Sequence, residues 1–328
     1  MNAPYPWQVE QWTQVCRNVG DGRLAHALLL HGRSGLGKHA FAQAVAGMLL
    51  CESRDPTGAA CGGCRGCTLF RAGNHPDFRA VSPLEDSSSI AIDQIRALID
   101  FYTLKAHYLG PKVVLLHPAD AMTRAASNAL LKLLEEPPAG AAFLLVANAH
   151  DRIPPTIRSR CQTLAMDKFD GAIALAWLGA TIDDTAVAKD LDAAFQLANR
   201  APLGARDALA AGLPRLAAQI DLEMEQVARG RLHASQAAQR CADAAPALTA
   251  DLMYRRVHQL LVGLPDSAPA DSIGLRDALH SQRLFKFIDT VVEVKGLCLA
   301  SATYRDGDLL DMLWRAWMQA WRPLPKEP

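Results

Sequence analysis

The feature that most constrains the fold is a glycine-rich segment that directly follows a short apolar run. Residues 27–30 are Ala-Leu-Leu-Leu, and residues 32–38 read Gly-Arg-Ser-Gly-Leu-Gly-Lys. This order is typical of a phosphate-binding loop between a buried strand and a helix, where backbone N–H groups cradle phosphates and the lysine reaches them. The candidate binding residues are Gly32, Gly35, Gly37 and Lys38. A tight strand-to-helix turn that binds no ligand is the alternative interpretation.

Two positions lack the residues that nucleotide hydrolysis needs. His39 stands where the motif has a Ser or Thr for Mg²⁺, and imidazole is a poor ligand for that hard cation. The apolar run at residues 113–116 should end in acids that orient Mg²⁺ and water, yet His117 and Pro118 follow it. Asp120 could take that role only if the end of the strand were rearranged. Hydrolysis is therefore not expected, while weak binding of a nucleotide or an anion stays open.

Apolar runs alternate with helical periods along the first half of the chain. The runs, which lack polar alternation as expected for parallel strands covered on both faces, are residues 27–31, 113–116 and 143–147. Residues 38–50 and 124–136 have helical periods, the second with Thr123 as N-cap and two prolines as its stop. From about residue 167 the pattern becomes helical. The order predicts an α/β protein with a parallel sheet between two helical layers, followed by an all-α part.

Four cysteines form the pattern C-x9-C-x2-C-x2-C: Cys51, Cys61, Cys64 and Cys67. Four soft ligands this close together, with glycines that let the backbone wrap an ion, predict a metal site with zinc as the favoured occupant. Closed coordination by four thiolates leaves no position for a substrate, so the zinc should be structural. An iron–sulfur cluster is the rival, but bacterial ferredoxins continue with Cys and Pro where this chain has Arg71 and Ala72. The remaining cysteines are expected to be small buried hydrophobes: Cys16, Cys161, Cys241 and Cys298.

Composition adds few bounds. The chain has 328 residues, 50% of them hydrophobic, which suggests two or three domains. Lys plus Arg equals Asp plus Glu at 34 each, so contact with nucleic acid would need a local basic patch. The first residues do not have the basic and apolar pattern of a signal segment. No apolar run approaches the roughly 18 residues that a membrane span needs. We expect a cytoplasmic protein.

Two further segments carry a family resemblance. Residues 127–138 read Ser-Asn-Ala-Leu-Leu-Lys-Leu-Leu-Glu-Glu-Pro-Pro, and residues 143–148 lead to Thr-Ile-Arg-Ser-Arg-Cys at 156–161. Together with the loop they closely resemble bacterial clamp-loader subunits of the AAA+ class, over at least residues 20–165. In that family the Ser-Arg-Cys triplet presents an arginine finger to the ATP site of the adjacent subunit. The resemblance therefore assigns this role to Arg160, with Arg158 as the second candidate.

Within that family, the chain resembles the subunit that does not hydrolyse ATP. The tau and gamma motor subunits keep the acids that this chain lacks after residue 116. Where the motor subunits place a second-sensor arginine, the best match here is Gly204, and Arg206 lies two residues further on. The resemblance implies a core at residues 1–166 with the zinc module at 51–67, a helical lid at 167–207 and a helical collar for oligomerisation at 208–328.

The implied function is that of a stator in the clamp loader of DNA polymerase III. Implied partners are tau/gamma and delta subunits in a hetero-pentamer, together with the sliding clamp and primed DNA, which this chain should contact through phosphates. Three alternatives stay open: an active ATPase motor subunit, a scaffold with no role in hydrolysis, and a zinc-dependent nucleic-acid module. The last is the least favoured, because only Arg54, Arg65 and Arg71 lie near the four cysteines in the sequence.

Overall fold

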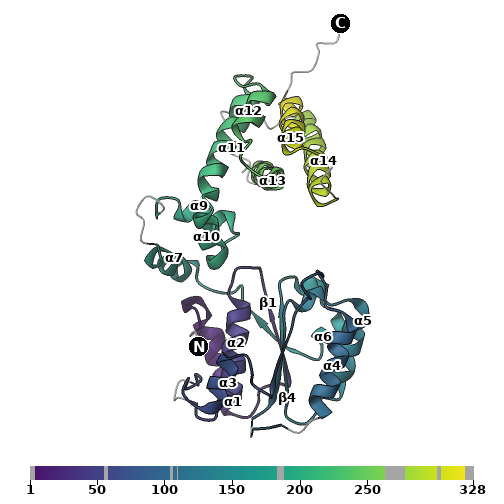
Figure 1. Ribbon diagram of the computed structural model, residues 1–328. Coiled ribbons are helices and arrows are strands. Elements are labelled where there is room, and N and C mark those ends of the chain that lie inside the picture. The colour runs from purple at the N-terminus through teal and green to yellow at the C-terminus, as the bar shows by residue number, and fades with distance from the viewer. Residues whose placement is uncertain are drawn as a thin grey trace. The chain divides into compact units, whose positions relative to one another are not determined.

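The computed structural model describes residues 4–54, 58–103, 106–108, 110–182, 188–262, 278–300 and 304–321. The chain divides into two compact units between Ala211 and Gly212 (Figure 1). The first unit contains a sheet of five parallel strands in the order β2-β3-β4-β1-β5. The strands are β1 (Ala27–His31), β2 (Phe78–Val81), β3 (Lys112–Leu116), β4 (Ala141–Ala147) and β5 (Gln162–Ala165).

The two faces of the sheet bury alternate residues of the same strands. In β1, Leu28 and Leu30 belong to one apolar cluster, while Ala27 and Leu29 belong to the other. The first cluster packs against α1 (Val9–Gly20) and α2 (Lys38–Leu49), and α3 (Arg65–Arg71) lies on the same side (Figure 1). The second packs against α4 (Ile92–Thr103), α5 (Arg124–Glu135) and α6 (Pro155–Arg158). The predicted α/β class is confirmed.

The central strands agree with the sequence prediction, and the edge strands were not predicted. β1 has the expected bounds, whereas β3 and β4 each begin one or two residues earlier than the apolar runs. The Thr123 hydroxyl accepts a hydrogen bond from the Ala126 N–H and caps α5, as predicted. β2 and β5 lie at the edges, where fewer side chains are buried, so neither has the continuous apolar run of a central strand.

Short helices complete the first unit. The 3-10 turns are η1 (Pro6–Gln8), η2 (Ala119–Ala121) and η3 (His150–Arg152). After β5 come α7 (Gly171–Ala180), α9 (Leu191–Leu197) and α10 (Pro202–Ala210), and α7 packs against η1, α9 and α10. The division between a core at residues 1–166 and a lid at 167–207 stays a prediction.

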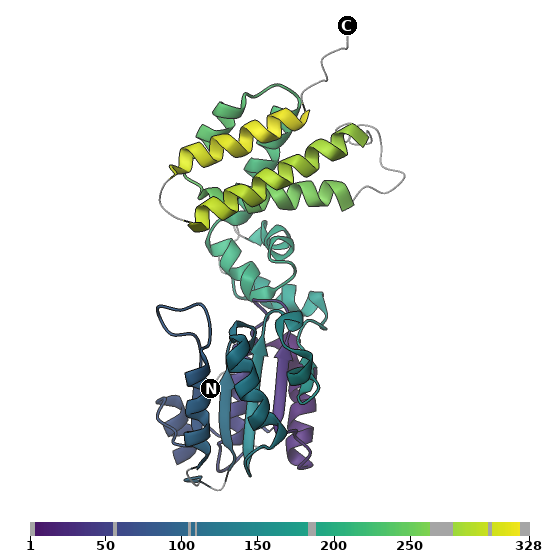
Figure 2. The same ribbon diagram turned by 90° about the vertical axis from the view of Figure 1, so that its right-hand side faces the viewer.

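The second unit is all helical where the structure describes it, in agreement with the predicted class. Its helices are α11 (Leu213–Ala228), α12 (Ala234–Arg240), α13 (Pro246–Val262), α14 (Ala278–Ala300) and α15 (Asp306–Trp321). Figure 2 shows α14 beside both α13 and α15, in accord with their contacts. Trp317 is buried, its ring packs on Phe287, and its Nε1–H donates to the Met224 carbonyl at 2.8 Å. Trp314 and Trp317 of α15 therefore belong to the core of this unit.

Candidate functional site

The glycine-rich loop has the backbone conformation of a strand-to-helix turn at the end of β1. Gly35 and Gly37 have φ values of 80° and 79°, in the left-handed region that only glycine adopts freely. α2 begins immediately afterwards at Lys38, with Gly37 as its N-cap. The four residues predicted from the sequence therefore lie together at one helix N-terminus, where backbone N–H groups can face an anion. They are Gly32, Gly35, Gly37 and Lys38.

Two protein oxygens hold the amino group of Lys38. Its Nζ donates to the Arg33 carbonyl at 2.6 Å and to the Asn148 side-chain oxygen at 2.8 Å, and the residue is only 4% exposed. Burial lowers the pKa of Lys38 to about 8, although Asp120 and Asp167 favour the charged form. The donor that a working loop directs at phosphates is thus engaged by protein oxygens, one in the loop and one after β4. Sequence reasoning missed Asn148, which follows the next strand of the sheet, β4.

The N-terminal segment closes one side of the loop. The Trp7 Nε1–H and the Gln8 side-chain amide both donate to the Leu36 carbonyl, at 3.1 and 2.8 Å. The Tyr5 ring stacks on Trp7 with centroids 4.7 Å apart, and a Cβ on Gly37 would lie 2.6 Å from this ring. Sequence reasoning missed this contact. The clustered aromatic residues at positions 5 and 7 were its signal in the sequence.

The N-terminus of α10 closes another side. The Leu203 N–H donates to the Gly35 carbonyl at 3.0 Å, and a Cβ on Gly35 would lie 2.9 Å from the Gly204 nitrogen. Gly204, the best sequence match for the second-sensor position, therefore lies against the glycine-rich loop. Arg206 pairs with Asp207 at 3.1 Å, and its side chain is 52% exposed.

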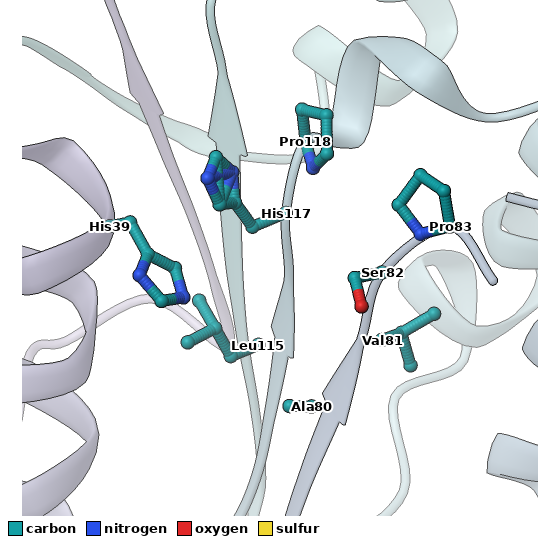
Figure 3. A pocket seen from close by; sticks show the side chains of 8 residues that line it. All are labelled: His39, Ala80, Val81, Ser82, Pro83, Leu115, His117 and Pro118. Atoms are coloured by element: carbon teal, nitrogen blue, oxygen red, sulfur yellow. The ribbon is translucent and has the colours of Figure 1, made fainter. Parts of the chain in front are cut away.

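Two histidines occupy the positions where a hydrolysing loop has its Mg²⁺ ligands. His39 on α2 and His117 after β3 have ring centroids 4.6 Å apart, and both line a cavity of about 380 Å³ with Ser82 and Pro83 (Figure 3). Burial lowers the pKa of both imidazoles, to about 4 for His117, where His39 and Lys38 add to the effect. Both rings are therefore uncharged at neutral pH.

The Asp120 carboxylate is engaged with the backbone after β4. Its two oxygens accept hydrogen bonds from the N–H groups of Asn148 and Ala149, at 3.0 and 3.2 Å. These bonds fix the segment that presents the Asn148 side chain to Lys38. Among the described contacts, Asp120 therefore acts as a structural anchor.

Arg160 and Arg158 differ in their surroundings. The Arg160 Nη2 lies 2.6 Å from the Glu135 Oε1, its Nη1 donates to the Thr156 carbonyl at 2.9 Å, and its side chain is 36% exposed. Arg158 instead contacts the His150 Nδ1 through its Nη1 at 3.2 Å, and its Nε is buried. Of the two, only Arg160 is held by an exposed carboxylate and a backbone carbonyl at the surface.

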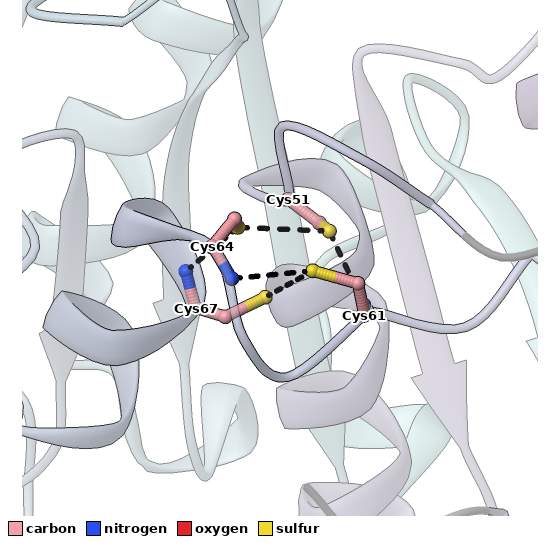
Figure 4. Close-up of side chains that lie close together, drawn as sticks. All are labelled: Cys51, Cys61, Cys64 and Cys67. Carbon is pink, nitrogen blue, oxygen red and sulfur yellow. Dashed lines mark hydrogen bonds between the residues drawn. The ribbon is translucent and has the colours of Figure 1, made fainter.

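The four clustered cysteines converge on one point (Figure 4). Their sulfur atoms all lie within 4.8 Å of one another. The distances from Cys51 to Cys64 and from Cys61 to Cys67 are both 3.9 Å between Sγ atoms. A tetrahedral zinc with bonds of about 2.3 Å needs sulfur atoms about 3.8 Å apart, so the cluster fits this ion. The predicted metal-ligating group is thus brought together and can hold a metal ion.

Backbone N–H groups support the same cluster. The amides of Cys61, Cys64 and Cys67 donate to the sulfurs of Cys51, Cys61 and Cys64, each at 3.3 Å. Burial opposes ionisation of Cys64, but hydrogen bonds from the backbone of Cys67 and Glu52 outweigh it and lower the pKa of this thiol to about 6. The N–H donors thus favour thiolates at Cys61 and Cys64, the form that binds a metal, whereas burial raises the pKa of Cys51 and Cys67.

The isolated cysteines agree only in part with the prediction of buried hydrophobes. Cys241 is buried, Cys16 and Cys161 are partly exposed, and Cys298 is exposed on α14, so the prediction is wrong for Cys298. None of the helices in the described part of the chain is long and apolar enough to cross a membrane.

Comparisons with known proteins agree on one family. Residues 7–170 match the family described as DNA polymerase III, delta subunit. The Pseudomonas aeruginosa DNA polymerase III subunit delta' is 38% identical over 235 residues, which cover 72% of this chain and 70% of that protein. The Escherichia coli subunit delta' is 37% identical over 175 residues, covering 53% of this chain and 52% of that protein.

Two further matches have lower identity or lower coverage. The Haemophilus influenzae subunit tau/gamma is 33% identical over 158 residues, covering 48% of this chain and 22% of that protein. A solved gamma subunit-related protein from Thermotoga maritima aligns with 96% of this chain and 100% of its own, with a TM-score of 0.46 and 18% identity. On the family match and the delta' relatives, the chain belongs to the DNA polymerase III delta-subunit family, as a delta prime clamp-loader component.

Proposed function

We propose that this chain is a non-hydrolysing stator that donates Arg160 to the ATP site of a neighbouring tau/gamma subunit. The observation that carries the proposal is the placement of the Arg160 guanidinium at the surface beyond α6, within the Ser-Arg-Cys triplet. A guanidinium delivered to a transferring phosphoryl group stabilises the charge that develops there. Arg158 is the weaker candidate, because it packs on His150 with a buried Nε.

The contacts of the loop support the absence of hydrolysis by the chain itself. Lys38 binds protein oxygens, and the carbonyl groups of Leu36 and Gly35 are bound by η1 and α10. His39 and His117 offer uncharged nitrogens where Mg²⁺ prefers oxygen ligands. Any binding of nucleotide at this loop would therefore be weak.

The metal site is proposed to hold one structural zinc ion. Cys51, Cys61, Cys64 and Cys67 would provide all four ligands, and the zinc would crosslink the start of α3 to the segment after α2. No ligand position would remain for a substrate. The role of the zinc would be to stabilise the first unit.

Assembly with other clamp-loader subunits is proposed to use the second unit as a collar. Phe285, Val292 and Leu299 recur every seven residues on α14 and are 58%, 63% and 88% exposed. An apolar stripe at this spacing on a helix suits packing against a helix of a neighbouring subunit. The proposed assembly is a hetero-pentamer with tau/gamma and delta subunits in the cytoplasm. It would load the sliding clamp on primed DNA, which this chain would contact only through phosphates.

The proposal is tested in a complex reconstituted with tau/gamma and delta subunits. Arg160→Ala should reduce hydrolysis at the adjoining ATP site by on the order of 10³-fold or more, with assembly unchanged on size-exclusion chromatography. The matched control is Arg152→Ala, which removes an exposed arginine of η3. An unchanged rate with Arg160→Ala would leave the chain a scaffold, and turnover by the isolated chain would make it a motor subunit.

A further inference from the structure

The Arg160 guanidinium is folded back over α6, the helix that ends two residues before it. Its Nη1 reaches the carbonyl of Thr156, four residues earlier, at 2.9 Å, and also lies 3.5 Å from the Ser159 hydroxyl. Its Nη2 reaches the Glu135 Oε1 at 2.6 Å. Two neighbouring elements thus determine the direction of this side chain, α6 through a carbonyl and α5 through its last residue. A side chain in this arrangement is not extended toward another molecule.

The Glu135 carboxylate uses the chemistry that a phosphate would use. Carboxylates and phosphates both bind the planar N–H groups of arginine through charge-assisted hydrogen bonds, so the two anions compete for one guanidinium. The side chains of Arg160 and Glu135 are 36% and 49% exposed, and ion pairs this accessible to water are weak. A polyphosphate with several negative charges can therefore displace this carboxylate.

We propose that Glu135 is a positioning residue that holds Arg160 in a resting position and releases it to the polyphosphate of a nucleotide bound by the adjacent subunit. The proposal rests on the donation of Arg160 in trans. Glu135 limits nucleotide binding next door, because its contact with Arg160 must break before the guanidinium can bind phosphate. Glu136, the neighbouring exposed carboxylate, makes no such contact in the described part of the chain and provides a matched control.

The resting contact is tested first in the isolated full-length chain. Arginine side chains are modified with phenylglyoxal, and the rate at Arg160 is followed by peptide mass spectrometry. Glu135→Gln keeps the shape of the side chain but removes its charge, and it should increase the rate at Arg160 several-fold. Glu136→Gln should leave it unchanged. Equal rates in wild type and Glu135→Gln would overturn the resting contact.

The functional consequence is tested in the reconstituted complex by titrating ATP. Breaking the resting contact takes the same free energy for the complex with bound nucleotide and for the transition state, because Arg160 is released in both. Glu135→Gln should therefore lower KM about two- to fivefold with kcat unchanged, the range that an exposed ion pair supports. In an Arg160→Ala background, Glu135→Gln should have no effect on KM. A lower kcat with unchanged KM, or an effect that persists without Arg160, would overturn the proposal.

The two experiments separate this proposal from the proposed function. If Arg160→Ala leaves hydrolysis unchanged, donation in trans fails, whatever the modification rates are. If Arg160→Ala abolishes hydrolysis while Glu135→Gln changes neither the modification rate nor KM, the arginine acts in trans and the resting contact with Glu135 is wrong.

Discussion

The imidazole rings of His39 and His117 lie with their centroids 4.6 Å apart, although 77 residues separate them in the chain. α2 carries the first ring and the end of β3 carries the second, so the fold alone brings them together. Two protonated rings this close would repel each other, and burial disfavours the charged form further. The pair is therefore stable in its uncharged state.

Acid should destabilise the first unit through His117. Its pKa is about 4 in the folded chain and about 6.5 when unfolded, so the unfolded state binds more protons between these values. The stabilisation is fully present above pH 6.5 and is lost as the pH falls toward 4. Between pH 7 and 4.5, wild type should lose about 1–2 kcal/mol more free energy of unfolding than His117→Asn. Urea denaturation measures this, and His107→Asn, at an exposed position of the same unit, should retain the wild-type loss.

The contact between Tyr5 and Gly37 should make that glycine hard to replace. Gly37→Ala puts a side chain on a backbone in the left-handed conformation, and its Cβ clashes with the Tyr5 ring. We therefore expect a loss of about 3 kcal/mol in the free energy of unfolding. Gly140→Ala has a similar φ of 71° with nothing within 4 Å, so it should lose only about 1 kcal/mol. The Tyr5→Ala background should remove most of the difference. Equal losses for the two alanine variants would contradict a close approach of Tyr5 to the loop.

The sequence predicts the centre of the fold better than its edges. β1, β3 and β4 are covered on both faces, so their apolar runs are continuous and recognisable. β2 has two exposed residues among its four, and β5 has one buried residue among its four, so neither has a distinctive pattern. Position in the sheet, which only tertiary structure determines, explains the two missed strands.

The candidate site divides in the same way between local and long-range features. The loop glycines and the four cysteines are close in sequence, and their spacing alone places them together. The distant partners of Lys38 and Arg160 are the side chains of Asn148 and Glu135, which lie far away in the sequence and have no local signal. The engagement of Lys38 by protein oxygens therefore could not be predicted from the motif.

Removal of the proposed zinc ion should destabilise the first unit. We expect one zinc per chain by elemental analysis of protein purified without chelator. A strong chelator, or Cys64→Ser, should lower the Tm by several degrees, because a structural ion contributes directly to folding. Cys298→Ser removes an exposed cysteine of the second unit and should change neither zinc content nor Tm. Full zinc content in Cys64→Ser would contradict coordination by all four cysteines.

The exposed stripe on α14 should control assembly without controlling folding. Val292 is 63% exposed, so Val292→Glu should leave the Tm of the isolated chain within about 1 °C of wild type. In the complex, a carboxylate in an apolar helix interface would be buried without a partner, and we expect at least a tenfold loss of affinity for the other clamp-loader subunits. Glu293→Gln, at the next exposed position of the same helix, should bind normally. Fluorescence titration of labelled chain with tau/gamma and delta subunits measures both affinities. If Val292→Glu binds as tightly as wild type, the assembly does not use this face of α14.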